Sequence, residues 1–245
     1  MKIVAIVQAR MGSTRLPGKV LKEVGNKPLL LYQLERIKRS KLIDQIIVAT
    51  TNKKEDDLIE LFCKDNGYSV YRGSELDVLN RYVAAAKYFE ADTIVRLTAD
   101  CPFIDPAVID LVIQRFLEHK QDKSLLYVSN TLERTYPRGL DVEVFSYDVL
   151  IEADRHARSF SEREHVTKYI VNHPEQFELV NVRQNKDFSH ERWTVDTKED
   201  FDMVKKILES LYPQNPNFTM ADVVKLLNNY PSWRKINAYI KQKEE

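Results

Sequence analysis

The chain is poor in several features that define common protein classes. Only two cysteines occur in 245 residues, Cys63 and Cys101, so we expect no disulfide framework and a reducing compartment. Positive and negative side chains balance at 37 each, which leaves no overall basic field to attract nucleic acid. No apolar run approaches the roughly 20 residues needed to cross a bilayer. These absences predict a cytoplasmic protein that binds neither nucleic acid nor membrane, so any anionic ligand must meet a local cluster of cations.

Apolar residues in the first half of the chain alternate between two periods. Short runs rich in β-branched residues are typical of buried parallel strands, and apolar residues spaced three and four apart are typical of helices. This order predicts an α/β fold, a three-layer sandwich with a mostly parallel sheet and right-handed crossovers. The predicted strands are residues 2–7, 45–50, 68–71 and 92–100, and the predicted helices are residues 28–39, 55–67, 77–88 and 106–119.

Residues 125–191 break this alternation. They hold short strand-like runs, and Ser161 with Glu164 three residues later has the spacing of a helix capping box. We expect an inserted α+β subregion that lies over the edge of the sheet. After it, the stretch "ERWTVDT", residues 191–197, predicts a late strand.

Helical patterns close the chain at residues 198–212, 219–229 and 232–241. The polar segment "YPQNPN" between the first two is the clearest linker in the sequence. It divides the chain into a main domain, residues 1–212, and a C-terminal helical extension, residues 213–245.

The stretch that leaves the first predicted strand, "VQARMGSTRLPGKVL", combines positive charge with little bulk. Ligands of open α/β sheets collect at the carboxyl ends of the strands, where this stretch begins. Gly12 and Ser13 allow the backbone to approach a ligand and to point N–H groups at it. Arg10, Arg15 and Lys19 suit the oxygens of a polyphosphate. The alternative is a solvated basic loop, because runs of charge usually face water.

Two acidic residues complete this candidate site. Asp100 and Asp196 each end a predicted strand, so both should lie at the same edge of the sheet as the basic loop. Two carboxylates beside phosphate make a site for Mg²⁺. Alternatively, each acid only caps the helix that follows it. Because like charges repel in the empty site, we expect an amide at either position to relieve repulsion and barely to lower the melting temperature, or even to raise it slightly.

Neither the Walker A pattern nor the dinucleotide pattern G-x-G-x-x-G is present in the basic loop. The loop instead resembles the opening of the cytidylyltransferases that make CMP-linked acidic sugars, the CMP-Kdo and CMP-sialic acid synthetases. It is most similar to the spore-coat polysaccharide branch of that family, SpsF. The resemblance covers about residues 1–202. The stretches that carry it are "QARMGSTRLPGKVL", "YRGSELDVLNRY", "RLTADCPFIDP", "YPRGLDVEVF", "REHVTKYI" and "RWTVDTKED".

This resemblance implies a nucleotide-diphospho-sugar transferase fold, which is Rossmann-like, and makes residues 1–212 a nucleotidyltransferase domain. It also implies CTP as the donor and Mg²⁺ as the cofactor. Arg10, Ser13 and Lys19 would hold the triphosphate, and Lys19, Arg10 and the metal would stabilise the departing pyrophosphate. The metal would be held by Asp100 and Asp196.

The same resemblance implies contacts to the nucleoside. The backbone of Ala9 would contact the base, and Gly73 and Arg81 would lie near base and ribose. Met11 stands where CMP-Kdo synthetases usually carry an aromatic residue, and this chain reads "LTAD" where they carry a different turn. The acceptor sugar therefore does not carry over from that subfamily.

The inserted subregion is the expected acceptor site. Its arginines could bind a carboxylate or phosphate on a sugar, and its acids could bind sugar hydroxyls. The alternatives are a salt-bridged surface or a dimer contact. The candidate acceptor-binding residues are Arg138, Asp141, Glu143, Glu164 and His165, with Arg134, Arg155, Arg158 and Arg163 also nearby in sequence.

Two other functions fit the same fold, because fold alone does not decide activity. One is a glycosyltransferase that consumes a nucleotide sugar, and the other is a non-catalytic nucleotide-binding subunit of a polysaccharide pathway. Three cations in the loop suit a triphosphate better than a diphosphate-sugar, and the presence of both Asp100 and Asp196 speaks against a non-catalytic role.

The insertion also predicts a quaternary structure. Short strands on a neutral protein of this size predict an interface, and we expect a homodimer with two-fold symmetry. Light scattering at micromolar concentration should then give twice the chain mass of 28.7 kDa. A monomer under those conditions contradicts the prediction.

Overall fold

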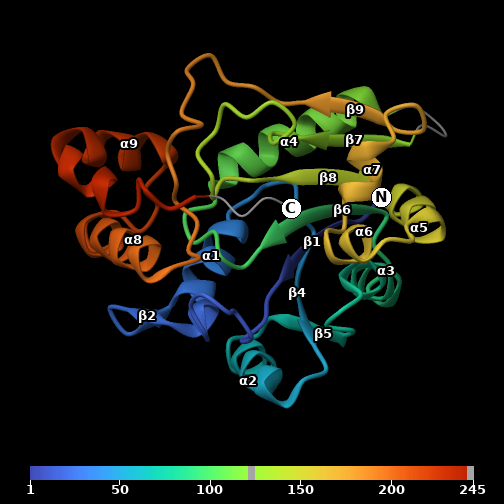
Figure 1. Cartoon of the computed structure of the whole chain (residues 1–245), viewed down its shortest axis with the longest axis horizontal. Coiled ribbons are helices and arrows are strands. Elements are labelled where there is room, and N and C mark those ends of the chain that lie inside the picture. The colour runs from blue at the N-terminus through green and yellow to red at the C-terminus, as the bar shows by residue number, and fades with distance from the viewer. Residues whose placement is uncertain (121–124, 242–245) are drawn as a thin grey trace.

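A seven-stranded sheet, in the order β5-β4-β1-β6-β8-β7-β9, runs through the computed structural model, which describes residues 1–120 and 125–241 (Figure 1). This architecture confirms the predicted three-layer α/β fold. The strands are β1 (Ile3–Gln8), β4 (Gln45–Thr51), β5 (Ser69–Gly73), β6 (Thr93–Thr98), β7 (Leu126–Ser129), β8 (Glu143–Ser146) and β9 (Glu178–Asn181), and β2 (Glu23–Val24) pairs separately with β3 (Lys27–Pro28).

The strand order reverses at β1. The chain first builds β4 and β5 on one side of β1, then returns to place β6 on the other side, and all four strands are parallel. Strand β8 is antiparallel to both β6 and β7, and β9 is parallel to β7. In sheets of this kind the ligand crevice opens at the carboxyl ends of the strands flanking the reversal. Here those strands are β1 and β6.

Helices cover both faces of the sheet (Figure 1). One face buries the apolar sides of α1 (Leu29–Ile37), α2 (Asp57–Asp65) and α4 (Pro106–His119), and α8 (Lys198–Leu211) and α9 (Met220–Asn229) join the same core. The other face is covered by α3 (Val78–Tyr88), α5 (Tyr147–His156) and α7 (Lys168–Asn172), with α6 (Phe160–Glu164) beside α3. Across the two described ranges, no helix has the length and apolar character needed to span a bilayer.

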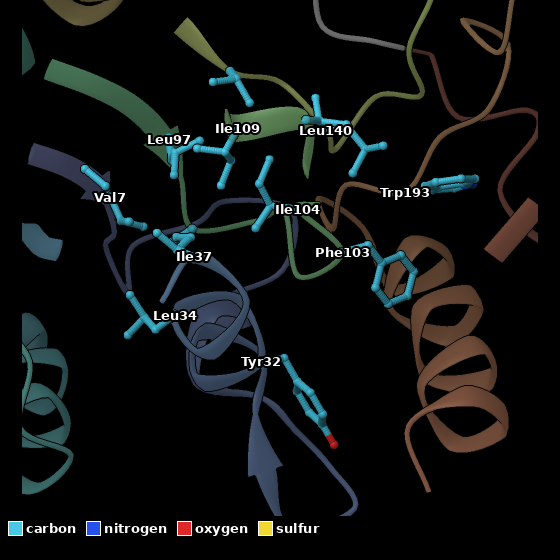
Figure 2. Close-up of a cluster of buried hydrophobic side chains, with 14 of the residues drawn as sticks. Val7, Tyr32, Leu34, Ile37, Leu97, Phe103, Ile104, Ile109, Leu140 and Trp193 are labelled. Carbon is cyan, nitrogen blue, oxygen red and sulfur yellow. The ribbon is translucent and has the colours of Figure 1, made fainter. Parts of the chain in front are cut away.

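Aromatic side chains tie the C-terminal part of the chain to the loop after β6. Figure 2 shows Phe103 and Trp193 as neighbours in the buried cluster, and their ring centroids lie 6.4 Å apart. The ring of Phe218 meets Phe103 edge-on at 5.7 Å. Offset and edge-on aromatic pairs add stability beyond the apolar area that they bury. The segments that carry Asp100 and Asp196 therefore share one buried core.

The sequence predicted that residues 125–191 would lie over the edge of the sheet. The structure shows that this prediction is wrong. The three strands of this subregion, β7, β8 and β9, continue the central sheet, and its helices extend the layer begun by α3. The predicted capping box is shifted by two residues. Ser159 caps α6, and the side chain of Glu162 accepts from the Ser159 N–H at 3.0 Å.

Two predicted C-terminal elements also differ from the structure. Residues 192–196 form no strand, and only one bridge joins Arg138 and Arg192. The helix predicted at 232–241 is instead a shorter 3₁₀ helix, Pro231–Ile236, and the side chains of Arg234 and Asn237 join it to the carbonyls of Leu227 and Arg192. The domain boundary at residue 212 stays a prediction, and the last four residues of the extension, 242–245, lie outside the described residues.

Candidate functional site

A cleft of about 600 Å³ opens at the carboxyl ends of β1 and β6, where the strand order reverses. This volume is within the range of small-molecule sites. The cleft is lined by basic side chains of the loop after β1, by Asp100 after β6, by Asp196 before α8 and by polar side chains from residues 131–165. The predicted site residues that line it are Ala9, Arg10, Ser13, Arg15, Lys19, Asp100, Arg138, Asp141, Glu143, Glu164, His165 and Asp196.

Lys19 lies at the centre of the acidic end of the cleft. Its Nζ donates to Asp100 Oδ2 at 3.0 Å and to Asp196 Oδ1 at 2.9 Å. The two carboxylates therefore meet around one ammonium group, although about a hundred residues separate them in sequence. Only 12% of the Lys19 side chain is exposed, so the open, solvated lysine that a basic loop suggests is not what the structure shows.

Burial and charge compete in setting the ionisation of this cluster. Burial alone would raise the pKa of Asp100, but the charge of Lys19 and the Thr98 hydroxyl, which donates at 2.7 Å, bring that pKa down to about 2. Burial also lowers the pKa of Lys19, but the two carboxylates outweigh it and the pKa is raised. Asp100 and Lys19 are consequently both charged at neutral pH.

Asp196 reaches the cluster without ending a strand. The segment before it is held by backbone bonds: Trp193 N–H donates to the Arg138 carbonyl at 2.7 Å, and Val195 N–H donates to the Asp100 carbonyl at 2.8 Å. Gly139 makes this close approach possible. It has a φ of +105°, and a Cβ there would lie 2.8 Å from the backbone of Trp193 and Thr194.

A second arginine holds Asp196 from the other side. Arg192 forms a fork on the buried carboxylate of Asp200 at 2.9 and 3.0 Å, and its Nη2 also donates to Asp196 Oδ2 at 2.8 Å. Sequence reasoning did not single out Arg192 or Asp200. The spacing of Thr197 and Asp200, which form a capping box at the start of α8, was the only local signal of this arrangement.

The basic loop is folded by its own backbone. The Met11 carbonyl accepts the N–H groups of Ser13 at 2.8 Å and Gly18 at 2.9 Å, and Gly18 adopts a φ of +67° to start the 3₁₀ turn Lys19–Leu21. This turn directs Lys19 back towards the acids. The Ser13 N–H is thus already used, and the hydroxyl is what Ser13 can offer a ligand.

The other predicted ligand-binding residues of the loop, Arg15, Arg10 and Ala9, differ in exposure and in their partners. Arg15 lies 3.3 Å from Asp196 Oδ1, whereas Arg10 is half exposed and 3.9 Å from Glu75. The N–H of Ala9 donates to the Ala49 carbonyl at 3.1 Å, so a contact to a base would come from its carbonyl oxygen. Arg15 therefore lies beside the acids of the cleft, and Arg10 lies nearer to solvent.

Three predicted nucleotide-binding residues do not line the cleft. Gly12 lies against Glu55, whose carboxylate oxygen is 2.7 Å from the position of a Cβ. Gly73 packs on the buried side chain of Arg81, which donates to the Ser74 carbonyl at 2.5 Å and holds the turn after β5. Their contacts with a nucleoside stay predictions.

The candidate acceptor residues are already organised by ion pairs. Arg134 donates two hydrogen bonds of 2.6 and 2.8 Å to the Asp141 carboxylate, and 35% of the Asp141 side chain remains exposed. Glu143 is nearly buried and accepts from Arg96, Tyr127 and Thr167. Other arginines of the subregion lie elsewhere. Arg155 pairs with Glu152, and Arg163 pairs with Asp77 and Asp154.

The residues fit a hard divalent ion. Mg²⁺ is usually held by one or two carboxylates together with phosphate oxygens and water. Asp100 and Asp196 provide two such carboxylates around a position that a cation, the Lys19 ammonium, takes in this structure. In the described residues, no group of three or more histidines, cysteines or acids is arranged to hold a metal by itself. A metal here would depend on its ligand's phosphates.

Comparisons with known proteins agree with this geometry. The family model described as cytidylyltransferase matches residues 4–244. The spore coat polysaccharide biosynthesis protein SpsF of Bacillus subtilis is 36% identical over 94% of this chain and 95% of its own.

Solved structures give the same result. A cytidylyltransferase from Leptospira borgpetersenii superposes with a TM-score of 0.90 at 36% identity, covering 100% of both chains. The structure of CMP:2-keto-3-deoxy-manno-octonic acid synthetase complexed with CTP has the same fold, with a TM-score of 0.64 at 18% identity over 85% of this chain and 99% of that chain. The chain is therefore an enzyme of the cytidylyltransferase family.

Proposed function

We propose that this enzyme transfers CMP from CTP to an acidic or phosphorylated sugar, with Mg²⁺, in the biosynthesis of a surface polysaccharide. The observation that carries the proposal is the Lys19 ammonium shared by Asp100 and Asp196 at the strand reversal. Phosphates of a bound nucleotide would offer Lys19 anionic partners in place of the two acids. Asp100 and Asp196 would then be available to hold a divalent ion, which would neutralise phosphate charge.

Each side chain then has a separate task. When bound, Mg²⁺ on Asp100 and Asp196 would neutralise phosphate charge and orient the α-phosphoryl group. Lys19 and Arg10 would bind the β- and γ-phosphates and stabilise the charge that develops on pyrophosphate as it leaves. Arg15, at 3.3 Å from Asp196, would add a further cation at the same end.

The reaction itself is a displacement at phosphorus. An oxygen of the acceptor forms a bond to the α-phosphorus of CTP, the bond to the β-phosphate oxygen breaks, and pyrophosphate leaves with the electron pair. An acceptor hydroxyl also loses its proton to water. No covalent intermediate on the enzyme is needed, because the rate comes from positioning and charge neutralisation.

The names of the relatives support the class of substrate. SpsF is named for polysaccharide biosynthesis, and a protein 36% identical over 48% of this chain is named 3-deoxy-manno-octulosonate cytidylyltransferase. Both names favour a sugar acceptor and CTP over the glycosyltransferase alternative.

Pyrophosphate release tests the proposal directly. Each of the four NTPs is incubated with Mg²⁺ and a panel of acidic and phosphorylated sugars. We expect release with CTP and one class of acceptor, and thermal-shift stabilisation by CTP, since a ligand that binds only the folded state raises its stability. Consumption of a nucleotide sugar without pyrophosphate release would favour the glycosyltransferase, and no Mg²⁺-dependent nucleotide binding would favour a non-catalytic subunit.

The acceptor end of the cleft gives a second test. Asp141→Asn should raise the KM for the acceptor about tenfold or more, because a hydrogen bond to a charged group contributes about 1.5–3 kcal/mol. The KM for CTP should not change. The matched control is Asp148→Asn, an exposed acid of the same subregion that does not line the cleft. Equal acceptor KM values for the two variants would exclude Asp141 from acceptor binding.

A further inference from the structure

We propose that Arg192 is a positioning residue for Asp196, and that Asn237 secures it, so that the C-terminal segment 231–241 takes part in building the metal site. This inference rests on the proposed role of Asp196 as a metal ligand. It deepens that role, because it explains how an acid on an irregular segment is held in one orientation.

The two oxygens of Asp196 have different partners. Oδ2 accepts from Arg192 Nη2 at 2.8 Å, which leaves Oδ1 turned towards Lys19 at 2.9 Å and towards Asp100 beyond it. Rotation of the carboxylate would break the contact with Arg192. The arginine therefore holds the plane of the carboxylate, with one oxygen facing the position of the ion.

Arg192 is itself held by a buried acid. Asp200 is fully buried, accepts the fork of Arg192, and also accepts the backbone N–H groups of Asp196 at 3.0 Å and Thr197 at 3.1 Å. One carboxylate thus fixes both the arginine and the backbone of the residue that the arginine orients.

Asn237 closes this network from the end of the chain. Its side chain is 3% exposed, and its Nδ2 donates to Asp200 Oδ1 at 2.8 Å and to the Arg192 carbonyl at 3.0 Å. Asn237 does not line the cleft, and among the hydrogen bonds of the described residues its amide donates to Asp200 and Arg192 and not to Asp196. Its effect on the site must pass through Asp200 and Arg192, about forty residues earlier in sequence.

Residues that hydrogen-bond to a metal ligand and orient it can affect metal affinity strongly without contacting the metal. Their replacement typically lowers metal affinity or activity by about 10- to 100-fold. Arg192 is suited to this task because its planar fork binds two carboxylates at fixed angles, which a lysine cannot do.

The test is Asn237→Ala, with Mn²⁺ as the probe ion. Mn²⁺ binding to the full chain is measured by electron paramagnetic resonance with α,β-methylene-CTP, which the enzyme cannot cleave. We expect a loss of Mn²⁺ affinity of about tenfold or more. In turnover, the Mg²⁺ concentration for half-maximal pyrophosphate release should rise by a similar factor, and high Mg²⁺ should restore most of kcat. Arg192→Lys should have a larger effect in the same direction, and Asn237→Ser, which keeps one donor, a smaller one.

The matched control is Leu227→Ala, in the buried face of α9. It loosens the same part of the molecule without touching the polar network, so it should lower the melting temperature and leave Mn²⁺ affinity within about twofold. Unchanged Mn²⁺ affinity in Asn237→Ala, or an equal loss in Leu227→Ala, overturns the inference. Full wild-type activity in a metal chelator would instead overturn the proposed metal itself.

Discussion

Replacing Lys19 with methionine is expected to slow CMP transfer by about 10²-fold or more, because a charge-assisted contact to phosphate is worth about 1.5–3 kcal/mol and more in the transition state. Methionine keeps the length of the apolar stem and removes only the charge. Steady-state pyrophosphate release with CTP and Mg²⁺ measures the effect.

The structure adds a second consequence for this variant. Lys19 is the cation between Asp100 and Asp196, so its loss leaves two poorly solvated carboxylates facing each other. Removing one partner of such a buried cluster costs on the order of 3 kcal/mol in the free energy of unfolding. Added Mg²⁺ should then raise the melting temperature of Lys19→Met more than that of the wild type, because the ion enters a site that the ammonium no longer fills.

Lys22→Met is the matched control for both measurements. Lys22 follows the same 3₁₀ turn but does not line the cleft. It should keep activity within about twofold of the wild type, because its partly buried side chain lies over the Phe201 ring, with Nζ 5.7 Å from the ring centroid, and outside the cleft. Wild-type turnover in Lys19→Met would remove the basic loop from the mechanism.

Asp100→Asn and Asp196→Asn should each lose most turnover, by about 10²-fold or more, because an amide is a weaker ligand for Mg²⁺ and does not neutralise its charge. Activity with CTP is measured over a range of Mg²⁺ concentrations, with Asp148→Asn as the control. Wild-type activity in either variant would contradict the two-carboxylate metal site.

The structure reverses the expected effect of these amides on stability. Two unpaired acids would repel, but both bond to Lys19, so an amide removes an attraction. The pKa of Asp100 is about 2 in the folded protein, below its value of about 3.9 in an unfolded chain. The carboxylate therefore contributes stability above about pH 4 and loses it as the pH falls towards 2.

Melting curves test whether the amide substitutions lower or raise the stability of the protein. Asp100→Asn should melt below the wild type at pH 7, and the difference should shrink as the pH falls from about 4 towards 2. An amide variant more stable than the wild type at pH 7 would show that repulsion between the acids outweighs their attraction to Lys19.

Much of the fold could be predicted because its signals are local. The alternation of strand and helix patterns predicted the parallel sheet, and parallel strands bring their carboxyl ends together, which placed Asp100 beside the loop of Lys19. The basic loop itself is one continuous stretch, so its cations were visible in the sequence. The strands at 125–191 were predicted as strands, but their position within the central sheet was not predicted. A period-2 pattern indicates that a segment is a strand and does not indicate which strand it pairs with.

What only the tertiary structure decided is how the cluster is held. Asp196 reaches Lys19 from an irregular segment, through backbone bonds to Arg138 and Asp100 that no local pattern encodes. The burial of Lys19 and the link from Asn237 to Asp200 also depend on contacts between segments far apart in sequence. The sequence by itself determined which charges are present, and that the basic loop follows β1 and Asp100 follows β6. Their partners depend on long-range packing, because a side chain's hydrogen bonds are set by the groups that the folded chain brings within about 3 Å of it.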